Sequence, residues 1–264
     1  MPALTSSKIP FVKTLLLGDS GAGKTGALVS LVAAGYKVRV LDLDNKIATG
    51  ILPKAIMAAC PDKIGNVDYI SLRDKKKASA LGPIFDGVPQ TFTKAMELLN
   101  KWDDGTIPAT WGPDVVFVLD SLTFLGDAAF NWAKSMNSGV KDPRQWFYTA
   151  QQATEDVIGL LTSENFKTNV IVIAHVSWSN KTDASGATLT KGYPASIGKA
   201  LDNTIPAYFD NMILAQASAT LPVKRTIQTA QTSMVDLKNP ASFTMLPTLP
   251  LETGLATFFA ELKK

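Results

Sequence analysis

Apolar runs of strand length alternate with segments of helical spacing along most of the chain. The apolar, β-compatible runs are Phe11–Leu17, Lys37–Leu43, Asn66–Leu72, Asp114–Leu119 and Asn169–Ala174. Residues 23–34, 89–102 and 143–164 have the composition and spacing of helices. Strands that alternate with helices in this way predict βαβ units and a mainly parallel sheet.

The pattern changes after residue 175. Residues 177–193 are polar and rich in Gly, Ser, Thr and Lys, which is loop composition. Later strands are predicted at Phe209–Ala215, Arg225–Thr229 and Ser233–Asp236, and a C-terminal amphipathic helix at about 253–262. Because no internal repeat or clear linker is visible, we expect residues 1–264 to form a single domain with its core at about 11–240.

The octapeptide GDSGAGKT, at residues 18–25, follows the first apolar run and fits the pattern G-x-x-x-x-G-K-[ST]. Its glycines let successive backbone N–H groups point at phosphate oxygens, and the lysine adds a mobile positive charge. The helix that follows directs the positive end of its dipole at the same anion. The alternative is a Gly-rich turn without a ligand. We predict that a nucleotide is held by Gly18, Asp19, Ser20, Gly21, Ala22, Gly23, Lys24, Thr25 and Gly26.

Acidic residues follow two of the predicted strands, at the edge where open α/β sheets bind ligands. Asp120 comes directly after VVFVL, and we predict that it holds Mg²⁺ together with Thr25. The alternative is a helix N-cap, a role that Ser121 can also fill. Strand alternation places Asp42 and Asp44 on the same side, with Asp44 further out as the candidate base for water activation. The alternative for Asp44 is a solvated strand end.

The one histidine, His175, ends the strand NVIVIA and precedes the polar segment. A lone histidine is as readily structural as functional. If it contacts the terminal phosphate, it couples nucleotide state to the order of the segment after it.

The composition of the chain excludes several kinds of site and class of protein. A net charge of +3 does not by itself indicate a nucleic-acid-binding protein. One cysteine, Cys60, and one histidine exclude a disulfide framework and clusters of Cys or His around a metal. No signal-peptide pattern and no run of transmembrane length is present, so we expect no membrane association and a cytoplasmic location.

The motifs GDSGAGKT, VLDLDN, VVFVLDSLTFL and NVIVIAH, in this order, resemble the RecA-like recombinase core. The resemblance covers most of residues 11–240 and implies a RecA-like P-loop NTPase fold: α/β, with a mainly parallel central sheet flanked by helices and late antiparallel strands. It implies ATP and Mg²⁺ as cofactors and a homo-oligomer, ring or filament, with nucleotide between subunits. No base-reading motif is visible in the residues themselves, so the preference for an adenine or a guanine nucleotide stays open. The stretch YPASIGKALDNTIPAYFDNMIL is similar to phage nucleotide-binding proteins made of the bare core, some of which act in annealing and recombination.

The resemblance also assigns roles. Asp44 matches the acidic residue that activates water, although the family position is Glu, and His175 matches the γ-phosphate sensor, where RecA has Gln. RecA-like ATPases borrow a Lys or Arg from the next subunit, and Lys238 in MVDLKNP lies in the corresponding region, with Arg225 as a second candidate. The alternative for Lys238 is an ordinary surface lysine.

In the resembled family, a mobile loop touches single-stranded DNA, and the resemblance implies that residues 177–196 correspond to it. Single-strand binding combines cations with aromatic faces. The candidate DNA contacts are Trp178, Lys181, Lys191, Tyr193, Lys199, Lys141 and Arg144. Arg73 with Lys75, Lys76 and Lys77 forms a further basic run. Helical aromatics are more often core, and charge runs are more often solvated faces, so these alternatives stay open.

The motifs and the resemblance together favour a DNA-dependent ATPase that binds single-stranded DNA and promotes annealing or recombination. The resemblance alone implies that it is encoded by a phage and acts in the host cytoplasm. A rival hypothesis is an ATP-gated loader or accessory factor that binds a replisome partner or a single-strand binding protein and hydrolyses little ATP. A small-molecule kinase is disfavoured because the loops near the site carry few arginines.

Overall fold

The fold is built on a central sheet whose inner strands are the apolar runs of the sequence. The computed structural model describes residues 11–137, 139, 142–182, 186 and 188–264. In this part of the chain, an eight-stranded sheet has the order β12-β11-β10-β1-β7-β6-β2-β3. The inner parallel strands are β1 (Lys13–Leu17), β2 (Lys37–Asp42), β6 (Gly112–Asp120), β7 (Thr168–Ala174) and β10 (Asn211–Ala217), and β3 (Val67–Ser71) is the parallel strand at the edge.

The strands from β10 across to β3 are parallel, and the two pairings at the other edge, β10 with β11 (Arg225–Gln228) and β11 with β12 (Thr248–Pro250), are antiparallel. Because parallel neighbours need crossover connections, helices cover both faces of the sheet. The predicted α/β class, with a mainly parallel sheet and late antiparallel strands, is confirmed.

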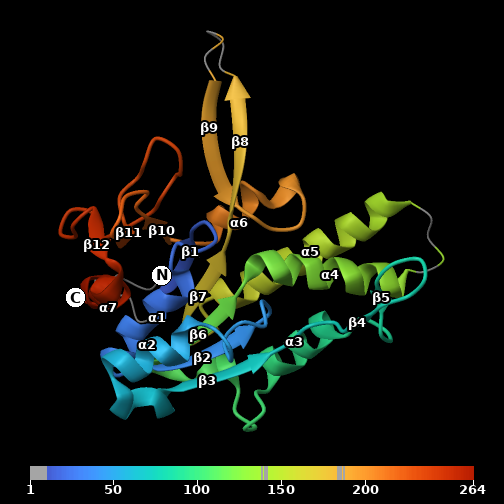
Figure 1. Ribbon diagram of the computed structural model, residues 1–264, viewed down its shortest axis with the longest axis horizontal. Helices are drawn as coiled ribbons and strands as arrows, with labels where there is room; N and C mark the ends of the chain where they lie inside the picture. The colour runs from blue at the N-terminus through green and yellow to red at the C-terminus, as the bar shows by residue number, and fades with distance from the viewer. Residues whose placement is uncertain (1–10, 138, 140–141, 183–185, 187) are drawn as a thin grey trace, which may run out of the picture.

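Successive side chains of each inner strand enter two separate cores. In β6, Phe117 and Leu119 pack on one face with α3 (Thr91–Asn100), α4 (Leu122–Met136) and α5 (Pro143–Thr162). Val116 and Val118 pack on the other face with α1 (Lys24–Ala33), α2 (Ile51–Ala59) and α7 (Leu251–Leu262). Figure 1 shows this helix–sheet–helix layering.

Two segments differ from the sequence prediction. The polar segment expected to be a loop contains β8 (Val176–Thr182) and β9 (Thr188–Pro194), which pair as an antiparallel hairpin that projects from the body of the molecule (Figure 1). Several of its paired positions join two polar residues, as in Asn180 opposite Thr190, and the apolar ones are isolated, so no apolar run marks the strands. The strand predicted at Ser233–Asp236 is reduced, in the described structure, to an isolated parallel bridge between Val235 and Gly192. There the Thr232 hydroxyl and amide bond locally to Val235 and close a turn.

The remaining elements are small. The strands β4 (Lys76–Lys77) and β5 (Ile84–Phe85) form a short ribbon, and α6 (Thr204–Ala207) is a single turn. The C-terminal helix is confirmed as α7, which packs against α1. Within the described residues, no helix combines the length and hydropathy needed to cross a bilayer.

Candidate functional site

The glycine-rich octapeptide forms a loop between β1 and α1 at the carboxyl edge of the sheet. Gly21 and Gly23 have φ of 81° and 96°, in the left-handed region that favours glycine. At Gly18 the reason for glycine is different, because a Cβ would lie 2.7 Å from the carbonyl oxygen of Ala215 in β10. The loop is therefore held against the neighbouring strand by residues without side chains.

Lys24 is the first residue of α1 and is 8 % exposed. Its Nζ donates to the carbonyl oxygens of Gly18 at 2.7 Å and Asp19 at 3.0 Å, so the ammonium lies over its own loop. Burial lowers the pKa of Lys24, while the carboxylates of Asp120 and Asp44 act in the opposite direction. A cation held in this way is placed to bind an anion that enters the loop.

Asp120 ends β6 and is 4 % exposed. The Thr25 hydroxyl donates to its Oδ2 at 2.7 Å, which brings together the two residues predicted to hold Mg²⁺. Burial, and then the nearby charge of Asp44, raises the pKa of Asp120 to about 7. Paired hard oxygen donors at a buried, negatively charged position fit Mg²⁺, which prefers one or two protein oxygens completed by phosphates and water. No cluster of three or more His, Cys, Asp or Glu around a metal position occurs among the described residues.

Asp44 lines the same cavity, as predicted, but strand alternation does not explain its position. The strand β2 ends at Asp42, and the amides of Leu43 and Asp44 then turn to the carbonyl oxygen of Asp120. Asp42 is fully buried and accepts hydrogen bonds from the Lys46 and Ile47 amides. Asp42 is therefore structural, whereas the Asp44 side chain is presented to the cavity.

Ser121 occupies the N-cap position of α4, but its hydroxyl makes no capping hydrogen bond. It donates instead to Oδ1 of Asp44 at 2.9 Å. Lys46 Nζ lies 4.0 Å from the other oxygen of Asp44. The carboxylate of Asp44 is thus oriented by a neighbour that sequence reasoning had assigned to the helix end.

His175 is half-buried and lines the cavity beside Lys24 and Asp120. Its backbone N–H donates to Thr123 Oγ1 at 3.3 Å, and its ring meets Phe124 edge-on with centroids 6.4 Å apart. Burial, and then the positive charge of Lys24, lowers the pKa of His175. The imidazole is therefore neutral at neutral pH, so it can donate one hydrogen bond and accept another.

The cavity formed by these residues has a volume of about 720 Å³, within the range of sites for small molecules and cofactors. Its polar end is the loop with Asp44, Asp120 and His175. Its apolar wall comes from α1 and α2, with Val29, Ile51 and Ala55. Sequence reasoning missed this wall, although the apolar stretch ILPKAIMAA soon after Asp44 was available as a signal.

Two contacts tie distant segments to the glycine-rich loop. Arg225 Nε donates to the Gly21 carbonyl oxygen at 3.1 Å and lines the cavity. The indole of Trp178, in β8, donates to Oδ1 of Asp19 at 3.1 Å. Arg225, the weaker of the two finger candidates, thus reaches the loop of its own chain. The projecting hairpin is anchored on the same loop.

The other predicted residues are dispersed. Lys238 is exposed, and its Nζ donates to the carbonyl oxygens of Pro206 at 2.8 Å and Phe209 at 3.2 Å, so its role in a neighbouring subunit stays a prediction. Lys191 pairs with Asp236 at 2.9 Å. Half-buried Tyr193 also lies in β9, and exposed Lys199 lies in the short turn after it.

Arg144 pairs with Asp142 at 2.8 Å at the start of α5, far from the hairpin in Figure 1. Lys141 and the side chain of Lys181 lie outside the described part of the chain. The described candidates for DNA contact are therefore divided between the hairpin region and the start of α5, and they do not form one surface.

Comparison with known proteins gives a family match. A family model described as an AAA domain matches residues 11–241. No curated protein matches the chain.

Similar solved structures include the RadB recombinase, with 17 % identity, a TM-score of 0.45, and 84 % of this chain and 81 % of that chain covered. A prototypical ATPase from the type III secretion system of pathogenic bacteria has 12 % identity, a TM-score of 0.45, and 78 % and 52 % covered. The ATP synthase subunit NeqB of Nanoarcheaum equitans has 11 % identity, a TM-score of 0.43, and 96 % and 54 % covered. The chain thus spans about half the length of the last two. Identities this low carry no information about substrates.

Proposed function

This chain belongs to the AAA domain family over residues 11–241, and from that premise we propose that it is a RecA-like P-loop ATPase that binds single-stranded DNA and promotes annealing or recombination. One observation carries the proposal. Thr25 and Asp120 meet at 2.7 Å beneath a glycine-rich loop, in a cavity that also holds Asp44 and His175. A phosphate-binding loop, an oxygen pair suited to Mg²⁺, a candidate base and a candidate sensor are the parts that ATP hydrolysis needs.

We assign ATP to the cavity of about 720 Å³. The loop amides and Lys24 bind the phosphates, and the apolar wall of Val29, Ile51 and Ala55 receives the base. Thr25 and Asp120 hold Mg²⁺, which when bound neutralises charge on the phosphate oxygens. The protonated fraction of Asp120 must then lose its proton, because a metal ligand has to be ionised.

We assign to Asp44 the activation of the water that attacks the terminal phosphate. Its carboxylate is 7 % exposed and faces the cavity, while the Ser121 hydroxyl holds Oδ1 in place at 2.9 Å. A fixed orientation leaves Oδ2 to accept a proton from water, which is what a general base requires. Aspartate reaches one methylene less far than the glutamate of the resembled family, so the water must lie close to the strand end.

His175 is proposed to report the nucleotide state to the DNA-binding segment. It lies between β7 and β8, so any shift of its side chain toward a terminal phosphate acts directly on the first residue of the hairpin. The Trp178–Asp19 hydrogen bond supports the same coupling from the phosphate-binding side. In an oligomer with nucleotide at subunit interfaces, Lys238 is the proposed finger. Arg225 supports the loop within its own subunit.

The test is ATP hydrolysis with and without single-stranded DNA. We expect DNA to raise turnover of the wild type, Lys24→Ala to abolish turnover, and His175→Ala to lower the ratio of the two rates toward one. Lys94→Ala, on the exposed side of α3, is the matched control for Lys24→Ala and should keep the wild-type ratio.

Turnover that DNA does not change, with no ATP-dependent DNA binding, would refute the DNA-dependent function. Tight ATP binding with negligible hydrolysis under those conditions would favour the ATP-gated loader or accessory factor. Phage origin and the choice between annealing and recombination remain part of the proposal.

A further inference from the structure

A second cavity lies against the back of the proposed ATP site. It has a volume of about 560 Å³ and is enclosed by the segments after β2 and β3, the β4–β5 ribbon and α4. The wall between the two cavities is one chain segment. Asp44 and Lys46 line the ATP cavity, whereas Leu43 and Asn45 line the second one. A ligand in the second cavity would therefore contact the residues that precede and follow Asp44 in the chain.

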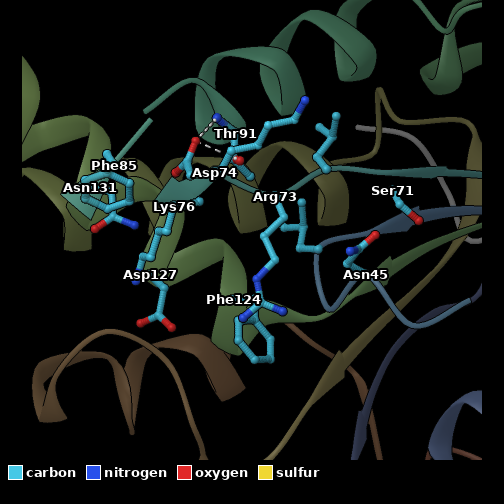
Figure 2. Close-up of a pocket in the computed structure, with 14 residues that line it drawn as sticks. Asn45, Ser71, Arg73, Asp74, Lys76, Phe85, Thr91, Phe124, Asp127 and Asn131 are labelled. Atoms are coloured by element: carbon cyan, nitrogen blue, oxygen red, sulfur yellow. Dashed lines mark hydrogen bonds between the residues drawn. The ribbon is translucent and has the colours of Figure 1, made fainter. Parts of the chain in front are cut away.

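The lining combines cations with aromatic rings. Arg73, Lys75 and Lys76 border the cavity together with Phe85 and Phe124. The Arg73 guanidinium lies 5.5 Å from the centre of the Phe124 ring, and Lys76 Nζ lies 5.3 Å from that of Phe85. Figure 2 shows Phe85 and Asn131 on one side, Asn45 and Ser71 on the other, and Arg73 and Phe124 between them. Cations beside ring faces are the combination that binds a nucleotide strand, with phosphate on the charge and base on the ring.

The two acidic residues of the lining, Asp74 and Asp127, cancel only part of this charge. The carboxylate of Asp74 is oriented toward the start of α3, because its Oδ1 accepts hydrogen bonds from the amides of Gln90 and Thr91 and from the Thr91 hydroxyl. Burial raises the pKa of Asp127, opposed by the charges of Lys76 and Arg73. Three basic side chains against two carboxyl groups leave the lining with an excess of positive charge even when both carboxyl groups are ionised.

The neighbouring lysine provides a natural comparison. Lys76 and Lys77 form β4, and adjacent strand residues point to opposite sides. Lys76 lines the cavity, whereas Lys77 Nζ pairs with Asp86 Oδ1 at 3.1 Å and does not line it. The two lysines thus carry equal charge on one strand but differ in access to the cavity.

Side-chain contacts connect the cavity to the ATP site. Arg73 Nη1 donates to the backbone carbonyl oxygen of Asp44 at 3.4 Å, a long hydrogen bond that a competing anion can replace. The Phe124 ring beneath Arg73 meets the ring of His175 at 6.4 Å. A ligand that draws Arg73 away from Asp44 alters the contacts of both the proposed base and the proposed sensor.

We propose that this second cavity receives one nucleotide unit of single-stranded DNA, with its phosphodiester on Arg73 and Lys76 and its base on Phe85. The proposal rests on the function proposed above and assigns a DNA site to it. It places this contact at the 73–85 segment, apart from the projecting hairpin and the start of α5. The strand then acts on ATP hydrolysis through Arg73 and the 43–46 wall.

The test measures binding of a fluorescein-labelled oligothymidylate by anisotropy, with a non-hydrolysable ATP analogue, Mg²⁺ and a series of salt concentrations. Lys76→Ala should weaken binding and reduce the slope of log K against log salt by about 0.7, the contribution of one single-strand phosphate contact. Phe85→Ala should raise Kd roughly 5-fold to 100-fold without changing the slope. Lys77→Ala should keep the wild-type slope. An abasic oligomer of equal length should bind the wild type and Phe85→Ala alike.

The outcomes separate the two proposals. If the wild type binds DNA and Lys76→Ala keeps the slope of Lys77→Ala, the cavity does not contact the strand and the inference is wrong, while the DNA-binding function stands. A cavity that serves an acidic segment of a partner protein would give that result. If the wild type does not bind the oligomer at all, the proposed function fails, and the inference fails with it.

Discussion

Asp120 makes the stability of the nucleotide-free protein depend on pH near neutrality. Its pKa is raised from 3.8 to about 7, first by burial and then by the charge of Asp44, a shift that corresponds to about 4 kcal/mol. Between these two pKa values the folded protein keeps a proton on Asp120 that the unfolded chain has lost. The contribution of Asp120 to the free energy of unfolding therefore falls as pH rises from about 4 to about 7, and its full cost is present above 7.

The perturbation is Asp120→Asn, which removes the ionisation and keeps an oxygen for the Thr25 hydroxyl. The variant should be more stable than the wild type, and its advantage should grow by about 2–3 kcal/mol between pH 5 and pH 8. This is a large part of the 5–15 kcal/mol that stabilises a typical protein. Urea unfolding at four pH values, without nucleotide or Mg²⁺, measures it. In thermal melts each kcal/mol corresponds to about 2–4 °C for a chain of this size.

The control is Asp104, an exposed residue whose pKa is shifted in the opposite direction. Hydrogen bonds from Thr106 hold the pKa of Asp104 at about 2, so its ionised form stabilises the fold above pH 4 and that stability is lost as pH falls through about 2. Asp104→Asn should therefore be less stable than the wild type at neutral pH. If the difference between Asp120→Asn and the wild type were constant from pH 5 to pH 8, the burial argument would be refuted.

Three further predictions concern packing and coupling. The Trp178 indole donates to Asp19 and should change its emission when ATP and Mg²⁺ are added, so Trp178→Phe, which removes this reporter, should shrink the total change; an unchanged signal would mean that Trp178 does not sense the loop. Gly126→Ala places a Cβ 2.9 Å from the Ile197 amide and should cost about 1–3 kcal/mol in chemical denaturation; full stability would show that α4 can move away from that segment. Asp42→Ala leaves two amides and a serine hydroxyl without their acceptor and should cost about 3 kcal/mol in the same assay, with a loss below 1 kcal/mol contradicting its structural role.

The parts of the fold that the sequence predicted are those in which one local rule decides the outcome. The inner strands are continuous apolar runs because both of their faces are buried, and this pattern leaves little ambiguity. The place of the glycine-rich loop between β1 and α1 was predictable because its glycines and Lys24 occupy fixed spacings. Asp120 was predictable because a single acid directly follows a buried strand.

The parts that were not predicted depend on contacts between distant residues. The β8–β9 hairpin has polar side chains on both faces, so its composition is that of a loop. Ser121 looked like a helix cap, and only the turn after β2 brings Asp44 within its reach. Arg225 meets the glycine-rich loop because β11 lies two strands from β1, a neighbour relation that strand order establishes and local sequence does not.

The connection between β7 and β8 lets a small rotation near the core move the projecting hairpin by a larger distance. The strands β7 and β8 are separated by His175 alone, so β8 continues from the core strand without a flexible connection. At about 3.4 Å per residue, Thr182, which follows His175 by seven residues, lies roughly 24 Å along the strand from that pivot. A tilt of about 5° at His175 would move Thr182 by about 2 Å, a displacement large enough to exchange one set of hydrogen-bond partners for another. A small rotation at His175 is therefore enlarged along β8 into a change of contacts at the far end of the strand.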